Sequence, residues 1–241
     1  MNLSPSVLAA ALVPPFLLAW YARSWTSRRL SSGLTVVLFM LGALSVFPQV
    51  YLTSWFEPDL VNISDPYRAG LSEALLTAAL PEEVMRLLVL ILAVILARGI
   101  DEPLRGMAYG AVLASGFAAV EGLFGALGGE GMLKMAVGRT LSAASHCFNG
   151  AIMGSFVAGA WLNPRRRRLN LLLALAAPVL LHTLYDFAIL TEVPGAAETP
   201  EDEPPPFAAL GLMLLFPTVW IVELVWTVAL IRRCRSARPS A

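Results

Sequence analysis

Ionisable side chains interrupt four long apolar stretches of this chain, and their types suit acid–base or metal-assisted hydrolysis. Carboxylates and imidazoles can take up protons, activate water or bind a metal ion. A charge at the centre of a membrane helix costs roughly 2.5–3.5 kcal/mol, so such residues are expected to be paired or functional. The residues are Glu82, Glu83 and Arg86 in the first stretch, Glu121 in the second, Arg139 and His146 in the third, and His182 and Asp186 in the fourth.

The spacing of these residues places several of them on shared helix faces. Glu82 and Arg86 are four residues apart, as are His182 and Asp186, so each pair lies on one face of a helix. Glu83 is turned by about 100° from Glu82, because an α-helix has about 3.6 residues per turn. The two adjacent carboxylates are therefore expected to have different roles.

Carboxylates outnumber the fixed positive charges within the apolar stretches. Five acids against two arginines leave excess negative charge even after full pairing. Either some carboxyl groups stay protonated through desolvation, or the histidines are protonated, or a metal cation is bound. The fifth acid stands alone in its stretch and is expected to form a structural hydrogen bond. The acids are Glu82, Glu83, Glu121, Asp186 and the lone Glu223, and the arginines are Arg86 and Arg139.

The chain is far more apolar than a soluble domain. It has 241 residues, of which 57% are hydrophobic and 14% are charged, and its mean hydropathy is +0.70. In soluble domains about half of the residues are apolar and about a quarter are charged. We therefore predict an all-α integral membrane protein surrounded by the lipid bilayer. The formal net charge of zero gives no reason to expect a nucleic-acid partner.

Seven apolar stretches are each long enough to cross a bilayer as a helix. The connections are short, so neighbouring helices should run antiparallel in a single bundle that forms one domain over residues 1–241. The first stretch has no basic segment before it and is expected to be a spanning helix rather than a cleaved signal peptide. The predicted spans lie near residues 3–22, 33–54, 71–97, 105–127, 136–162, 169–190 and 207–231.

Basic residues are concentrated in alternate connections, which hold 13 of the 17 Lys and Arg residues. Because positively charged loops stay in the cytoplasm, the amino terminus should lie outside and the carboxyl terminus in the cytoplasm. With a helical rise of about 1.5 Å per residue, the ionisable residues then share one layer between the middle of the bilayer and its outer surface. The basic residues are Arg23, Arg28 and Arg29, then Arg98 and Arg105, then Arg165 to Arg168, and finally Arg232, Arg233, Arg235 and Arg238.

Glycine and proline give further expectations about the helices. Pro81, directly before the two glutamates, cannot donate a backbone hydrogen bond and predicts a kink or local unwinding there. Small residues let membrane helices approach closely. The glycines expected to do so are Gly106, Gly110 and Gly116 in the fourth stretch and Gly138, Gly150 and Gly154 in the fifth.

Four motifs follow one another along the chain. They are EExxR at 82–86, FxxxE at 117–121, an arginine followed by HxxxG at 146–150, and HxxxD at 182–186. In this order they resemble the PrsW family of intramembrane proteases, a relative of the type II CAAX prenyl endopeptidases and the bacterial Abi proteins. The resemblance implies a multi-pass protein of a bacterial plasma membrane. It also implies cleavage of a single-span membrane protein near the extracytoplasmic side, an anti-sigma factor being the substrate known for the family.

The resemblance further implies roles for the residues that match. One of the adjacent glutamates would activate water, and the histidines would orient that water or stabilise the oxyanion. The implied catalytic residues are Glu82, Glu83, Glu121, His146 and His182. The implied supporting residues are Arg86, Arg139 and Asp186. The chain departs from the family pattern at Arg86, where Lys is usual, at Gly122, where Asn is usual, and at Asp186, where Asn is frequent.

The cofactor and the function class keep alternatives open. His146 and His182 together with Glu83 or Glu121 are suitable zinc ligands, and a metal-free mechanism is equally open. A proton-coupled transporter or channel would also hold ionisable residues in mid-membrane, although no inverted repeat is apparent. A catalytically silent scaffold that binds another membrane protein is a further alternative. Other intramembrane proteases are disfavoured, because the sequence lacks the HExxH, GxSG and GxGD motifs.

Overall fold

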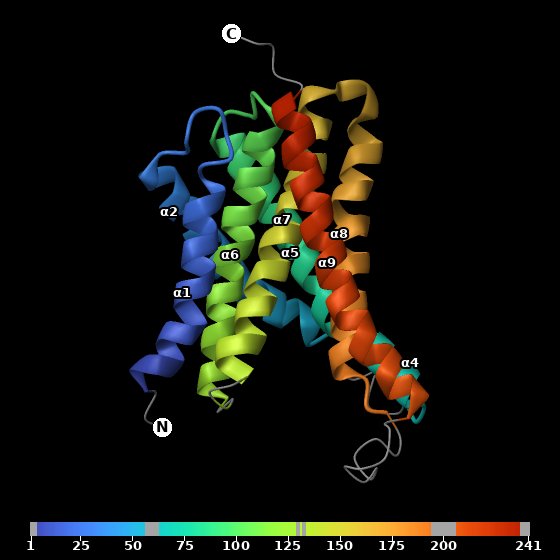
Figure 1. Cartoon of the computed structure of the whole chain (residues 1–241). Helices are drawn as coiled ribbons and strands as arrows, with labels where there is room; N and C mark the ends of the chain where they lie inside the picture. Colours follow the sequence, from blue (N-terminus) through green and yellow to red (C-terminus); the bar gives the residue numbers. More distant parts are fainter. Residues whose placement is uncertain (1–3, 56–62, 129–130, 132–133, 194–205, 237–241) are drawn as a thin grey trace.

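The computed structural model describes residues 4–55, 63–128, 131, 134–193 and 206–236, and these residues are almost entirely helical (Figure 1). No strand occurs among them, which confirms the all-α prediction. The elements are α1 (Pro5–Ala22), α2 (Ser32–Thr53), α4 (Pro66–Ser72), η1 (Glu73–Ala79), α5 (Leu80–Leu96), α6 (Pro103–Leu127), η2 (Lys134–Gly138), α7 (Arg139–Leu162), η3 (Pro164–Arg166), α8 (Arg167–Leu190) and α9 (Phe207–Ser236).

Each predicted span coincides with one helix or one continuous helical run. The third run starts earlier than predicted, at Pro66, because the Asp65 carboxylate accepts from the amide of Arg68 at 2.8 Å and caps the helix there. In the described part of the chain, five helices are long and apolar enough to cross a membrane, namely α1, α2, α6, α8 with η3, and α9. The other two runs, through α5 and α7, are not among these five; α5 itself has 17 residues and includes Glu82, Glu83 and Arg86. The seven-span topology and its orientation stay predictions.

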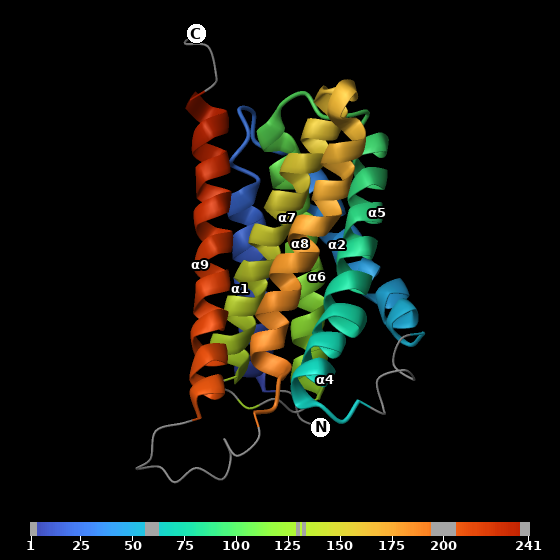
Figure 2. The same cartoon turned by 90° about the vertical axis from the view of Figure 1, so that its right-hand side faces the viewer.

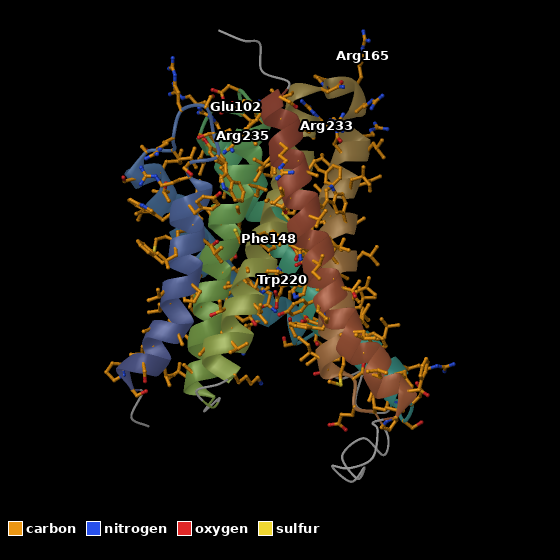
Figure 3. All side chains as sticks on the ribbon, viewed as in Figure 1. Glu102, Phe148, Arg165, Trp220, Arg233 and Arg235 are labelled. Atoms are coloured by element: carbon orange, nitrogen blue, oxygen red, sulfur yellow. The ribbon has the colours of Figure 1, made fainter. Side chains whose placement is uncertain are left out.

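The two ends of the bundle differ in charge. Figure 3 shows Arg165, Arg233 and Arg235 at the same end, although they come from different parts of the chain. We call this the basic end. Helix α1 begins at the opposite end, which we call the outer end (Figure 1). The predicted orientation places the basic end in the cytoplasm.

Helix α6 lies at the centre of the bundle and packs against α1, α2 and α7 (Figures 1 and 2). The contact with α7 is close because neither helix has side chains there. A β-carbon added at Gly110 would collide with the backbone carbonyl of Gly150, and one added at Gly154 would collide with that of Gly106. These glycines therefore have the packing role that the sequence predicted for them.

The remaining two glycines of that prediction differ from each other. Gly116 of α6 approaches α2 so closely that a β-carbon would collide with the carbonyl of Phe39. At Gly138, by contrast, a β-carbon would meet only the Lys134 side chain, at 3.6 Å, among the described residues. The prediction of close helix packing at Gly138 is therefore wrong, because this residue ends η2 at the loosely packed start of α7.

The run that leads into α5 is locally widened. Element η1 is π-helical and ends shortly before Pro81, so the distortion predicted at this proline lies about one turn earlier. Pro81 cannot donate to the carbonyl of Thr77, four residues before it. Instead the Thr53 hydroxyl of α2 donates to that carbonyl at 3.0 Å, and Gln49 donates to the Thr53 oxygen at 2.9 Å. Helix α2 thus fixes the start of α5, which carries the two glutamates.

Candidate active site

The Arg86 guanidinium joins four other ionisable residues into one buried cluster. Its Nη2 atom lies 3.1 Å from Glu82 Oε2 and 2.8 Å from Glu83 Oε1. The same nitrogen lies 3.2 Å from His182 Nδ1, and Nη1 lies 2.9 Å from His146 Nδ1. Residues from α5, α7 and α8 therefore meet at one cation. The planar guanidinium suits this position, since it offers several donors in a fixed fork.

An aromatic ring closes the cluster on one side. The Arg86 guanidinium carbon lies 4.8 Å from the centre of the Phe117 ring, which is 1% exposed. The same ring packs against His146, with 5.6 Å between ring centres. A cation over an aromatic face is stabilised more strongly where water is excluded. The phenylalanine of the FxxxE motif is thus part of the site, and its glutamate is one turn away.

Glu121 holds His146 in place. Its Oε2 atom lies 2.7 Å from His146 Nε2, and its Oε1 atom accepts from Arg139 at 2.6 Å. Because a guanidinium can only donate, His146 Nδ1 accepts from Arg86, and its Nε2–H donates to Glu121. These contacts fit a neutral His146 in a single tautomer.

His182 has partners for two protonation states. Its Nε2 atom lies 3.1 Å from Asp186 Oδ2, and its Nδ1 atom lies 3.1 Å from Glu83 Oε1. A doubly protonated ring would donate to both carboxylates. A neutral ring would donate to Asp186 and accept from Arg86 at Nδ1. His182 can therefore gain or lose a proton without losing its hydrogen bonds.

A cavity of about 620 Å³ opens onto one side of the cluster. Glu82 faces this cavity, whereas Glu83 is fully buried and does not line it. The structure thus separates the two adjacent carboxylates by their access to water. The other ionisable residues on the cavity wall are Glu121, Lys134, Arg139, His146, His182 and Asp186.

Three side chains of the cluster offer ligand atoms for a metal ion. Glu82, His146 and His182 each offer one ligand atom, and these atoms lie within 4.8 Å of one another. Two imidazoles and a carboxylate are ligands that zinc prefers. This set contains Glu82, whereas the sequence suggested Glu83 or Glu121 as the carboxylate ligand. A bound ion would replace some of the present contacts of the ring nitrogens.

The local charge also suits a cation. Four carboxylates, Glu82, Glu83, Glu121 and Asp186, stand against Arg86, Arg139 and the Lys134 side chain of the cavity wall, which leaves one negative charge when both histidines are neutral. A bound cation would lie in a site with excess negative charge. The residues present therefore fit a metal by donor type and by charge.

One polar pair near the site was not predicted. Asn149 of α7 donates to the Glu223 carboxylate of α9 at 2.9 Å, and both side chains are buried. The sequence suggested only an unspecified structural hydrogen bond for Glu223. Asn149 follows His146 by three residues, at about one helical turn, which is the only signal that could have pointed to it.

Similarity to known proteins identifies the family of this chain. A sequence model described as the PrsW family of intramembrane metalloproteases matches residues 31–222, which include every residue of the cluster. The chain belongs to the PrsW family. All four motifs recognised in the sequence fall within the matched PrsW range.

Curated relatives agree with the PrsW assignment. Protease PrsW of Halalkalibacterium halodurans is 30% identical over 191 residues, or 77% of this chain and 84% of the relative. Protease PrsW of Oceanobacillus iheyensis is 28% identical over 188 residues, or 76% of this chain and 83% of the relative. Protease PrsW of Bacillus subtilis is 30% identical over 152 residues, or 63% and 67%. No solved structure matches the chain significantly.

This PrsW-family protein is therefore an intramembrane protease and a multi-pass bacterial membrane protein. The membership favours the protease over the transporter and the silent scaffold that the sequence left open.

Proposed function

We propose that this protease cleaves its substrate with a water molecule activated by Glu82. The observation that carries the proposal is the position of Glu82, which lines the cavity together with both histidines while Glu83 is buried behind it. A base must reach the proton that it removes, directly or through one water. Glu83 has no such access and instead contacts Arg86 and His182.

The surrounding residues would assist each step of the hydrolysis. Glu82 takes a proton from water as the water oxygen attacks the peptide carbonyl. Glu82 then gives this proton to the departing amine nitrogen as the C–N bond breaks, which returns the carboxylate to its starting state. His182, whose Nε2 lies 3.9 Å from Glu82 Oε2, would help to hold this carboxylate in place, and Asp186 holds the ring through Nε2. Arg86 supplies positive charge beside the reacting carboxylate and favours the developing oxyanion electrostatically.

A metal-assisted mechanism is the alternative to this scheme, because Glu82 and His182 would then be ligands of the ion. Glu82, His146 and His182 are the residues that would hold it. When bound, a divalent ion would polarise the peptide carbonyl and lower the pKa of its water. Glu121 and Asp186 would then orient the two imidazoles from behind, as second carboxylates commonly do around metal-bound histidines.

We further propose that the substrate is a single-span membrane protein cut near the extracytoplasmic side. The cavity reaches toward the outer end of the bundle, since it includes residues from η2 and from the end of α8. If the basic end lies in the cytoplasm, as the positive-inside rule predicts, the cut would lie near the extracytoplasmic side. An anti-sigma factor anchored in the membrane is the first substrate to test.

The test uses the reconstituted protein with a panel of tagged single-span proteins, including an anti-sigma factor. Glu82→Gln should lower the cleavage rate at least 100-fold, and His182→Ala should lower it by a similar factor. The matched control is Glu73→Gln, because Glu73 is an exposed carboxylate on the same helical run that does not line the cavity. Full cleavage by well-folded Glu82→Gln would refute the proposed base.

The metal question needs a separate measurement. Elemental analysis of the purified protein should give about one zinc per chain if the donor set is used, and His146→Ala with His182→Ala should abolish it. Cleavage that persists after exhaustive chelation, in protein shown to be free of metal, would instead establish the metal-free form of the mechanism.

A further inference from the structure

The catalytic cavity has an opening between two helices that separate toward the outer end. Its walls include Ser142 of α7 and Leu212, Met213 and Phe216 of α9. Figure 1 shows that α7 and α9 lie close together near mid-bundle and diverge toward the end at which α1 begins. Met213 lines the cavity and is 66% exposed, so the cavity reaches the side of the bundle as well as its end.

The burial of helix α9 differs before and after Pro217. All three of its buried residues, Val219, Glu223 and Thr227, follow this proline. No residue from Phe207 to Phe216 is buried. The part of α9 before Pro217 therefore packs less tightly than the part after it, although Phe216 contacts Tyr185 of α8 with 4.9 Å between ring centres. The same part forms one wall of the catalytic cavity.

Polar contacts fasten the part of α9 that follows Pro217 to α7. Figure 3 shows Trp220 beside Phe148 in the middle of the bundle, and their ring centres are 5.7 Å apart. Hydrogen bonds between membrane helices hold them in a fixed register. The bonds are Trp220 Nε1 to the carbonyl of Leu141 at 3.2 Å, Asn149 Nδ2 to Glu223 Oε1 at 2.9 Å, and Thr227 Oγ1 to the carbonyl of Phe148 at 3.4 Å.

Pro217 interrupts the backbone hydrogen bonding between these two parts of α9. Pro217 has no amide hydrogen and cannot donate to the carbonyl of Met213, four residues earlier. Sharp bends in helices occur mainly at such positions. The backbone hydrogen bonding of α9 is therefore interrupted between the less tightly packed part and the part fastened to α7.

We propose that the opening between α7 and α9 admits the substrate sideways from the lipid, and that residues 207–216 form its movable wall. The inference rests on the proposed function and adds the route and the class of ligand. The ligand is the outer end of a single-span helix. Its apolar side chains would pack against Leu212, Met213 and Phe216, and its peptide bond would reach Glu82.

The wall opposite α9 suits a segment that is locally unwound. A peptide bond inside a helix has its carbonyl hydrogen-bonded and must be released before attack. In lipid, each released backbone group must find a new partner. Ser142 of α7 lines the cavity and offers a hydroxyl group at this place. We therefore expect a preference for substrates whose outer end contains helix-breaking residues.

Photo-crosslinking tests the entrance without depending on cleavage. A photoreactive amino acid replaces Met213, which lines the opening and is 66% exposed, or its neighbour Leu214, which is 59% exposed and does not line it. Both residues lie at the same depth, so they differ only in the face of α9 that they occupy. The probe is a biotinylated Leu/Ala single-span peptide with a Gly-Pro pair near its outer end, reconstituted with the full-length protein in vesicles.

The expected result is at least fivefold more adduct from Met213 than from Leu214, with a lower ratio for the same peptide without the Gly-Pro pair. Equal yields from the two positions, or adducts of Met213 with lipid alone, would overturn the proposed entrance. Because the readout is binding, a selective Met213 adduct supports the entrance even if Glu82→Gln still cleaves. Conversely, equal adduct yields beside normal cleavage would remove the entrance and leave the proposed function intact.

Discussion

Arg86 is the residue on which the geometry of the cluster depends, since it contacts two carboxylates and two imidazoles. A lysine would keep the charge, but its single ammonium cannot contact two imidazoles through separate nitrogens, as Nη1 and Nη2 do. Arginine therefore holds the two imidazoles to one side chain in a way that lysine could not.

The first prediction follows from this difference. Arg86→Lys should fold, and its cleavage rate should fall about tenfold because the two histidines lose their common partner. Arg86→Gln should unfold more easily by about 3–5 kcal/mol, since it leaves two buried carboxylates without compensation. Thermal unfolding in detergent and cleavage in vesicles measure the two effects. Equal stability of both variants would show that the charge of Arg86 is not needed for folding.

The close contact between α6 and α7 positions His146 relative to Glu121 and Phe117. Gly110→Ala should destabilise the protein by about 1–3 kcal/mol, because the new methyl group collides with the backbone of Gly150. Gly33→Ala is the matched control. A β-carbon there has no neighbour within 4 Å among the described residues, so this change should be neutral or slightly stabilising. Unfolding curves of the two variants in the same detergent make the comparison, and similar curves would contradict the packing role of Gly110.

Helix α9 gives a prediction about movement. Pro217→Ala restores a backbone donor to the helix and should stiffen the wall, so cleavage of a single-span substrate should fall about threefold to tenfold. Pro48→Ala is the control, since Pro48 is also an exposed proline inside a helix but lies in α2, away from the cavity. A Pro217→Ala enzyme that matches Pro48→Ala in cleavage rate would argue that residues 207–216 need not move.

At the scale of the whole molecule, the predicted orientation can be measured. In a background without Cys147 and Cys234, a single cysteine is placed at Ser4, before α1, or at Ser236, the last residue of α9. A membrane-impermeant maleimide added to intact cells should label Ser4→Cys and not Ser236→Cys. Both positions should react after the membrane is opened. The reverse pattern would place the basic end outside and the cavity on the cytoplasmic side.

The sequence predicted the fold and the members of the cluster well, because both depend on strong local signals. Long apolar stretches predict helices in any arrangement, and ionisable residues inside them, such as Glu82 and His182, are too costly to be incidental. The contacts of Arg86 with both histidines could not be predicted, since they depend on how α5, α7 and α8 are placed relative to one another.

Other features had no usable signal in the sequence. Asn149 is a single amide in an apolar helix, and only the packing of α9 shows that it binds Glu223. The separation of Glu82 from Glu83 by exposure likewise depends on where the cavity lies. Periodicity could state that the two carboxylates point in different directions, but not which of them faces water.

The hydrogen bond from Thr53 to the carbonyl of Thr77 has a consequence for how the family can vary. The hydroxyl supplies a donor at a carbonyl that Pro81 cannot serve, so the need for Thr53 and the presence of Pro81 depend on each other. An amide at position 81 would compete with Thr53 for the same acceptor. Among relatives we therefore expect co-variation of these positions, with an apolar residue tolerated at the Thr53 position only where the proline is absent.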